Sequence, residues 1–297
     1  MIYLIYADNK RSIITYNLND EKKINEIKNA HSAFITNFRH FFDKNNKRDL
    51  IITIAGYENN IKLWNFNNFE CLIDITEINN DGRINSACFF KNDNNIYIVT
   101  SNCNNKGLSF AEPIKLYEFE GNKIKEINDS HELTYFIDIY EDNKNNKSYI
   151  ITGNEGYSKS YDYNNNTVYH KYEYEIWKNH CHMSIIIDKS EDTTKMIESS
   201  CIGNIVVWDF HSGKLIKIIN INKGWLYSIG FFEKNILFVG WKNGEIKLVD
   251  KTKGIIINNF KNSNEKVITI KKIDHPKYGE CLISKDISCI KLLMYKK

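Results

Sequence analysis

The feature that most constrains the fold is a stretch of twelve residues, 199–210, in the second half of the chain. Small residues lead into a polar turn that contains Gly203, and a β-branched run then ends at Trp208-Asp209. A strand, a polar turn and a second strand in this order favour an antiparallel sheet. Weaker copies of the second half of the pattern recur at Ile61–Asn65, Ile114–Glu118 and Ile246–Asp250.

The copies have a regular spacing along the whole chain. Alignment on Trp208 gives equivalent positions at Tyr16, Trp64, Tyr117, Tyr161, Val249 and Leu293, with intervals of 41 to 53 residues. This period is close to the roughly 40–45 residues of a four-stranded propeller blade, whereas heptads or helical stripes are not seen. Each repeat alone would expose two apolar sheet faces, which packing against neighbours buries. We therefore predict an all-β fold, a seven-bladed β-propeller of four-stranded antiparallel blades, formed by a single domain over residues 1–297.

Composition favours a soluble intracellular protein. Hydrophobic residues make up 42% of the chain, which is enough for a packed core, and the net charge is only +3. This balance gives no general attraction to nucleic acid. No apolar run approaches the roughly 20 residues that span a bilayer, and residues 1–8 lack the basic start of a secretory signal. We expect a cytoplasmic location, with the nucleus as the alternative.

The seven cysteines are scattered and form no CxxC pair, as is typical of a reducing compartment. The run His180-Cys181-His182 could place two imidazoles on one face of a strand. A second pair of ligands at the spacing of a zinc finger is missing from the sequence. We therefore predict that the protein binds no metal and needs no cofactor.

The repeats resemble those of the WD-repeat family over nearly the whole chain, in a divergent form. In that family a His, a Ser or Thr, an acid and a Trp form one hydrogen-bonded set within a blade. The second repeat matches the set with His31, Thr53, Glu58 and Trp64. The fifth repeat keeps Trp208 and Asp209 but has Ile202 where the acid belongs; the fourth matches at Glu155 and Tyr161, and the sixth has Asn243 at the acid position. The resemblance implies that these residues are structural; the other interpretation, a catalytic His/Ser/acid trio, is the less favoured one.

The resemblance also implies that two sets of loops open onto one face: the turns between second and third strands and the links into the innermost strands. Aromatic and Arg side chains dominate the energetics of protein interfaces. The residues expected on this face are Phe34, Tyr57, Arg83, Tyr135, Asn154, Trp177, Trp225, Tyr227, Trp241 and Lys242. Trp225 and Trp241 are the preferred protein-binding anchors and should be partly exposed on the same face. The alternative is that either ring packs between blades.

No Gly-rich phosphate loop, HExxH or GxSxG motif occurs, and no Arg-Arg pair of the kind that phosphoinositide-binding propellers use. The resemblance thus implies a platform for protein–protein interactions, a scaffold subunit of a larger assembly and not an enzyme. Its partners would be proteins or peptides, without nucleic acid or membrane. The alternative is a propeller that binds a small molecule or glycan in its central channel and could act as an enzyme.

Two further segments lead to expectations. The insertion Asn102–Pro113 should project from the loop face, where Leu108 and Phe110 either dock a partner or fold back onto the blade. The first repeat lacks an innermost strand and the seventh lacks an outermost one. We expect a weak seam between them, which a partner's strand seals by β-augmentation. Alternatively, the three-stranded blade persists, and Lys296 and Lys297 discourage further pairing.

Overall fold

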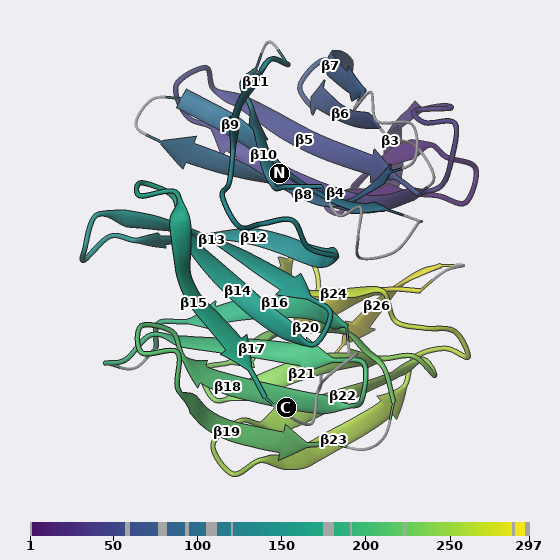
Figure 1. Cartoon of the computed structure of the whole chain (residues 1–297). Coiled ribbons are helices and arrows are strands. Elements are labelled where there is room, and N and C mark those ends of the chain that lie inside the picture. Colours follow the sequence, from purple (N-terminus) through teal and green to yellow (C-terminus); the bar gives the residue numbers. More distant parts are fainter. Residues whose placement is uncertain are drawn as a thin grey trace. The chain divides into compact units, whose positions relative to one another are not determined.

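The structure is a computed structural model that describes residues 2–294, except 57–59, 77–81, 93–94, 105–111, 120, 175–180, 191, 222–223 and 287–288. The described residues form the strands β1 to β26, which are arranged in seven sheets, and they contain no helix (Figure 1). Consecutive strands pair with each other in every sheet, and the pairs with a resolved register are antiparallel. The chain therefore builds each sheet from one continuous stretch of sequence.

The seven sheets follow one another in chain order, and we number them as blades one to seven. Blade one comprises β1 Tyr3–Ala7, β2 Ile13–Asn17 and β3 Lys22–Ile27. Blade two comprises β4 Ile35–Asp43, β5 Arg48–Ala55, β6 Asn60–Asn65 and β7 Glu70–Thr76. Blade three comprises β8 Gly82–Asn92, β9 Asn95–Asn104, β10 Lys115–Tyr117 and β11 Lys123–Glu126. Blade four comprises β12 Thr134–Asp142, β13 Lys147–Asn154, β14 Tyr157–Asp162 and β15 Thr167–Glu173.

The remaining three blades occupy the second half of the chain. Blade five comprises β16 His182–Asp188, β17 Lys195–Ser200, β18 Asn204–Asp209 and β19 Leu215–Asn220. Blade six comprises β20 Leu226–Glu233, β21 Ile236–Trp241, β22 Glu245–Asp250 and β23 Ile255–Lys261. Blade seven comprises β24 Thr269–His275, β25 Gly279–Lys285 and β26 Ile290–Met294.

The protein is thus an all-β seven-bladed β-propeller, as the spacing of the repeats predicts. The terminal blades have three strands each, which confirms the strand count expected for the first and seventh repeats. The chain divides into two compact units, each with most of its contacts inside itself. Unit 1 contains Met1–Ile5, Ile14–Glu26 and Tyr172–Lys297, and unit 2 contains Tyr6–Ile13 and Ile27–Lys171. The assignment of residues 1–297 to one domain stays a prediction.

Burial within a blade depends on the position of the strand. Second strands are apolar and almost wholly buried, as in β5, whose last six residues are all buried. Outermost strands are mostly exposed, as in β23, where only one residue of seven is partly covered. A strand with neighbours on both sides and sheets on both faces has to be apolar on both faces. This requirement explains why the strongest apolar runs in the sequence are second and third strands.

A buried chain of polar contacts in blade two confirms three members of the predicted set. The indole Nε1 of Trp64 donates to Thr53 Oγ1 at 2.8 Å, and His31 Nε2 lies 2.8 Å from the same oxygen. All three side chains are buried. Glu58, the fourth predicted member, lies outside the described residues. Because each polar atom of this contact chain has a partner, the indole can be buried without a desolvation penalty for its N–H group.

Blade five keeps the tryptophan but uses a different partner. Trp208 Nε1 donates to Glu198 Oε1 at 2.6 Å, and His182 Nδ1 lies 3.0 Å from Glu198 Oε2. Strand pairing places Glu198 at the position of Thr53, two residues beyond the residue opposite the tryptophan. All three side chains are buried. Glu198 was not identified from the sequence. His182, from the run His180-Cys181-His182, is part of this hydrogen-bonded set.

A second repeated device ends the third strands. In five blades the last residue of that strand is Asn or Asp, and its side-chain oxygen accepts a backbone N–H two or three residues further on. The acceptors are Asn17, Asn65, Asp162, Asp209 and Asp250, at 2.7 to 3.0 Å. Asn and Asp stabilise turns in this way because their short side chains mimic a backbone acceptor. The structural role predicted for Asp209 is thus to hold the turn between β18 and β19.

The first prediction concerns the two tryptophans at the ends of third strands. Trp64 and Trp208 are 6% and 2% exposed. We expect Trp64→Ala and Trp208→Ala each to lower the free energy of unfolding by about 3–5 kcal/mol, through lost transfer energy and a cavity. Urea unfolding followed by circular dichroism measures this loss. A loss below about 1 kcal/mol would contradict the packing described for that blade.

The second prediction concerns acid sensitivity. Burial opposes ionisation of Asp162, but hydrogen bonds from Asn165 and Lys147 outweigh it and lower its pKa from the ordinary 3.8. A lowered folded-state pKa stabilises the protein above pH 3.8, and this stabilisation is lost as the pH falls through the folded value. We expect Asp162→Asn to cost about 1 kcal/mol or less at pH 7. In urea unfolding, its deficit relative to wild type should shrink at pH 3; an unchanged deficit would contradict the prediction.

Candidate functional site

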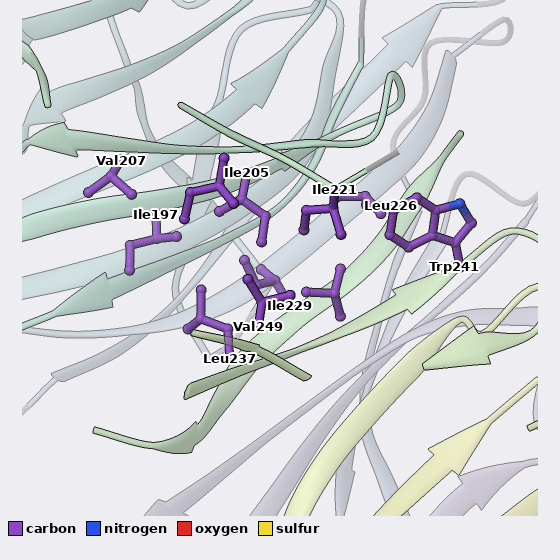
Figure 2. Packing of buried hydrophobic residues seen from close by; sticks show 11 residues of the cluster. Ile197, Ile205, Val207, Ile221, Leu226, Ile229, Leu237, Trp241 and Val249 are labelled. Carbon is purple, nitrogen blue, oxygen red and sulfur yellow. The ribbon is translucent and has the colours of Figure 1, made fainter. Parts of the chain in front are cut away.

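The structure separates the two tryptophans predicted to lie together on the loop face. Trp225 is 40% exposed, whereas Trp241 is 4% exposed and belongs to a buried cluster with Leu226 and Ile221 (Figure 2). The prediction that Trp241 is exposed is therefore wrong. The alternative, a ring packed between blades, is what the structure shows for Trp241.

The reason lies in the extent of one strand. The sequence Gly240-Trp241-Lys242 reads as the start of a turn, but β21 continues through Gly240 and ends at Trp241, which pairs with Leu226. The turn is held by hydrogen bonds from Lys242 N to Trp225 O and from Val267 N to Trp241 O, both at 3.0 Å. The side chain of Trp241 therefore follows the alternation of the strand into the core.

Trp241 also supports the backbone that carries Trp225. A Cβ atom at Gly224 would lie 2.6 Å from Trp241 Nε1, and Gly224 has φ +143°. Only glycine combines this conformation with so close an approach. The same indole also contacts a lysine: Lys247 Nζ lies 4.1 Å from the centroid of the Trp241 ring, a cation–π distance. The link into β20 therefore rests directly on a buried indole.

Above this support, four side chains form a surface that we call the Trp225 patch: Trp225, Tyr227, Lys242 and Lys266. The rings of Trp225 and Tyr227 are stacked, with centroids 6.0 Å apart and an interplanar angle of 30°. Lys242 Nζ lies 5.4 Å from the Trp225 ring, and Lys266 Nζ lies 5.1 Å from the Tyr227 ring. Links into β20 and β24 and the turn after β21 therefore meet here, all within unit 1.

The patch combines flat apolar area with positive charge. Burial raises the pKa of the Tyr227 hydroxyl, and the neighbouring Cys181 and Cys201 thiols raise it further. Tyr227 is therefore neutral at physiological pH and can donate a hydrogen bond. Lys266 was not among the residues predicted from the sequence, although it lies in the same kind of link as Trp225. Its position before an innermost strand was the signal that could have identified it.

The remaining predicted surface residues lie in unit 2 or outside the described residues. Phe34, in the link into β4, is exposed, and Tyr135 in β12 is half-buried. The backbone of Arg83 lies in β8, but its side chain is outside the described part. Tyr57 and Trp177 also fall outside the described residues, as do Leu108 and Phe110 of the insertion. Among the residues predicted on the loop face, the structure thus tests the exposure of Phe34, Tyr135, Asn154, Trp225, Tyr227, Trp241 and Lys242.

Asn154 was expected on the loop face, but it is buried in blade four. Its Nδ2 atom donates to Glu132 Oε2 and to Thr152 Oγ1, each at 3.0 Å, and its Oδ1 accepts from Thr134 Oγ1 at 2.8 Å. Glu132 in turn pairs with Lys159. An amide with this many partners holds strands together and is not available to a ligand, so the expectation of surface exposure is wrong.

The described residues contain no group of three His, Cys, Asp or Glu side chains arranged to hold a metal ion. The cysteines that the structure describes form no disulfide with one another, and burial raises the pKa of the Cys71, Cys88 and Cys281 thiols. Hydrogen bonds and ion pairs lower the pKa of six carboxyl groups, those of Glu21, Asp43, Asp162, Asp188, Asp209 and Asp250, and outweigh burial where it opposes ionisation. In the described part of the chain there is also no helix that could cross a membrane.

Comparison with known proteins adds no relative: neither a protein-family model nor a curated protein sequence matches this chain. The propeller fold is established by the seven sheets themselves. The resemblance to WD repeats rests on the spacing of the repeats, on partial matches such as Trp208-Asp209, and on the His31–Thr53–Trp64 set.

The third prediction contrasts the two tryptophans of blade six. We expect Trp241→Ala to reduce the free energy of unfolding by about 3–5 kcal/mol, because the buried ring fills a core cluster. Trp225→Ala should change it by less than about 0.5 kcal/mol, as is usual at exposed positions. Denaturant unfolding of the two variants side by side measures both. Equal losses would contradict the different positions of the two rings.

Proposed function

We propose that this chain is a divergent WD-repeat-type propeller that acts as a non-catalytic platform for protein or peptide partners within a larger cytoplasmic assembly. The observation that carries the proposal is the Trp225 patch. It presents a half-exposed indole, stacked on a tyrosine and flanked by two lysines, on loops that are fixed to a buried core.

The geometry of the patch suits an interface anchor for an energetic reason. Trp and Tyr bury large areas while losing few rotatable bonds, and they are enriched among residues that dominate binding. The stack with Tyr227 and the hydrogen bond between Lys242 N and Trp225 O hold Trp225 in place before any partner arrives. A preorganised surface loses less conformational entropy on binding. Lys242 and Lys266 can pair with carboxylates at the edge of a partner.

The alternative function, binding of a small molecule or glycan in a central channel, has no specific observation in its favour. Such a site would be indicated by acids that converge and have raised pKa values. The carboxyl groups of Asp162, Asp188 and Asp209 have lowered pKa values, and hydrogen bonds in turns or ion pairs account for the lowering. We therefore propose the platform and not an enzyme.

The fourth prediction tests the platform directly. Tagged wild-type protein and the Trp225→Ala variant should be purified from the native cells, and co-purifying proteins quantified by mass spectrometry. The main partner should then be titrated calorimetrically against both. We expect the variant to bind at least about 30-fold more weakly, corresponding to about 2 kcal/mol.

Ile257→Ala is the matched control, because Ile257 is a comparably exposed apolar residue on β23 of the same unit. It should leave both the partner set and the affinity unchanged. If Trp225→Ala retains every partner at wild-type affinity, the Trp225 patch is not the binding surface and the proposal fails.

A further inference from the structure

The two terminal blades are the only three-stranded sheets among the seven that the described residues form. The identity of the missing strand in each can be read from contacts that the complete blades repeat. In blades two, four, five and six, the third strand ends in Asn or Asp, whose side-chain oxygen accepts a backbone N–H of the next turn, as Asp209 and Asp250 do. The second strands of these blades end at Ala55, Asn154, Ser200 and Trp241 instead. Fourth strands consist mostly of exposed or half-buried residues, as in β19 and β23.

In blade one, β2 ends at Asn17, whose Oδ1 accepts from Asn19 N at 2.9 Å, and no residue of β3 is buried. Strands β2 and β3 are therefore the third and fourth strands. Strand β1 then occupies the second position, which is buried in complete blades, but four of its five residues are exposed or half-buried. Blade one thus lacks its innermost strand.

Blade seven lacks the opposite strand. Ile270 N of β24 donates to Ser228 Oγ of the innermost strand β20 at 3.1 Å, as Ile137 N of the innermost strand β12 donates to Ser86 Oγ of β8 at 3.3 Å, which places β24 in the innermost position. Strand β26 is therefore the third strand. The four central residues of the third strands β18 and β22 are all buried, whereas no residue of β26 is, and Met294 is 65% exposed. Blade seven thus lacks its outermost strand.

The two incomplete blades meet within unit 1 through polar side chains. Tyr278 OH donates to Glu21 Oε1 at 3.1 Å, and Lys277 Nζ lies 3.4 Å from the same oxygen. These hydrogen bonds also lower the pKa of Glu21, whose carboxyl group is open to solvent. Exposed contacts of this kind contribute little stability. The joint therefore resembles a rim contact and not the apolar joints between complete blades.

Joints that follow a complete blade have a common construction. The fourth strand supplies an apolar side chain that packs with residues of the next innermost strand. Ile219 of β19 lies in one cluster with Leu226 and Ile229 of β20, and Phe260 of β23 packs against the cluster that contains Ile270 of β24. Where blade seven meets blade one, the described residues supply neither the fourth strand nor the innermost strand that would make this contact.

The two strands that make such a joint are consecutive in the sequence. A fourth strand is followed directly by the innermost strand of the next blade, as in the segments Leu215–Glu233 and Glu70–Asn92. The two missing strands therefore correspond to one continuous segment of similar length. Within residues 2–294 no stretch of that size is left over, since the longest range outside the description is 105–111.

We propose that one continuous segment of a partner polypeptide completes both terminal sheets. It is as long as Leu215–Glu233, which supplies strands to blades five and six, or Glu70–Asn92, which supplies strands to blades two and three. Its first strand pairs with β26 and its second with β1. The first strand carries an apolar residue at the place of Ile219 or Phe260, and the second carries one at the place of Ile229 or Ile270. Strand addition supplies backbone hydrogen bonds to the open sheet edges, while these side chains fill the joint. The surface is independent of the Trp225 patch.

The first experiment fills the two edges with the chain's own sequence. Two glycines and a copy of residues 255–275 are added after Lys297, so that the link matches the connection Phe210–Lys214 between β18 and β19. A second version carries a copy of residues 215–233. Tethering gives the copy a high effective concentration at the edge. We expect amide hydrogen exchange in β26 and β1 to slow at least about tenfold in one or both versions.

The control carries prolines at the copied positions of Ile257 and Ile270, because proline removes a backbone donor and cannot continue a strand. It should leave exchange in β26 and β1 at the wild-type rate. If neither fusion protects these strands, or if the proline version protects them equally, the edges do not accept a two-strand segment and the proposal is overturned.

The second experiment identifies the occupant in the native cells. A benzophenone amino acid replaces Met294, and in a control protein it replaces Ile257 on the outer strand of a complete blade. We expect an adduct at Met294 whose cross-linked peptide maps to one segment of another protein. The same adduct should vanish in the fused protein and persist in the Trp225→Ala variant, which separates this surface from the platform proposal. Three results would each overturn the partner assignment. They are the absence of an adduct at Met294, an adduct to this polypeptide or to a second copy of it, and an adduct that persists in the fused protein.

Discussion

The packing of one sheet against the next is the interaction on which the rest of this protein depends. Each blade is only a short antiparallel sheet with apolar residues on both faces, and such a sheet is not stable alone in water. The clusters that contain Ile219 with Ile229 in unit 1, and Ile75 with Ile84 in unit 2, bury those faces between neighbours. The loops that face solvent are held in place only because these joints are filled.

The polar contacts inside the blades vary far more than the apolar packing does. Thr53 accepts the indole N–H in blade two, Glu198 does so in blade five, and blade four uses a set centred on Asn154. What stays constant in blades two and five is that the buried indole N–H has a hydrogen-bond acceptor. A repeat can therefore lose the residues that define a family motif and still keep its blade, which explains how the propeller persists in a chain that matches no family model.

The same packing also defines the two surfaces proposed for partners. The Trp225 patch lies on a link that rests against Trp241, so its exposed ring is held by a buried one. The edges at β1 and β26 are exposed for the opposite reason, because the side chains that would fill the joint are not supplied by the described residues. One surface is preformed and binds by side chains, whereas the other is incomplete and binds by backbone pairing.

The sequence by itself determined the period, the number of sheets, the burial of Trp64 and Trp208, and the three strands of each terminal blade. These features depend on local apolar patterns that recur every 41 to 53 residues, and local patterns can be read without coordinates. Only the tertiary structure decided that Trp241 is core while Trp225 is surface. Side chains alternate along a strand, so the extension of β21 by a residue beyond Gly240 fixes the side to which the ring points. The pairing of Glu198 with His182 and Trp208 was equally hidden, because it joins three strands of one blade and depends on their register.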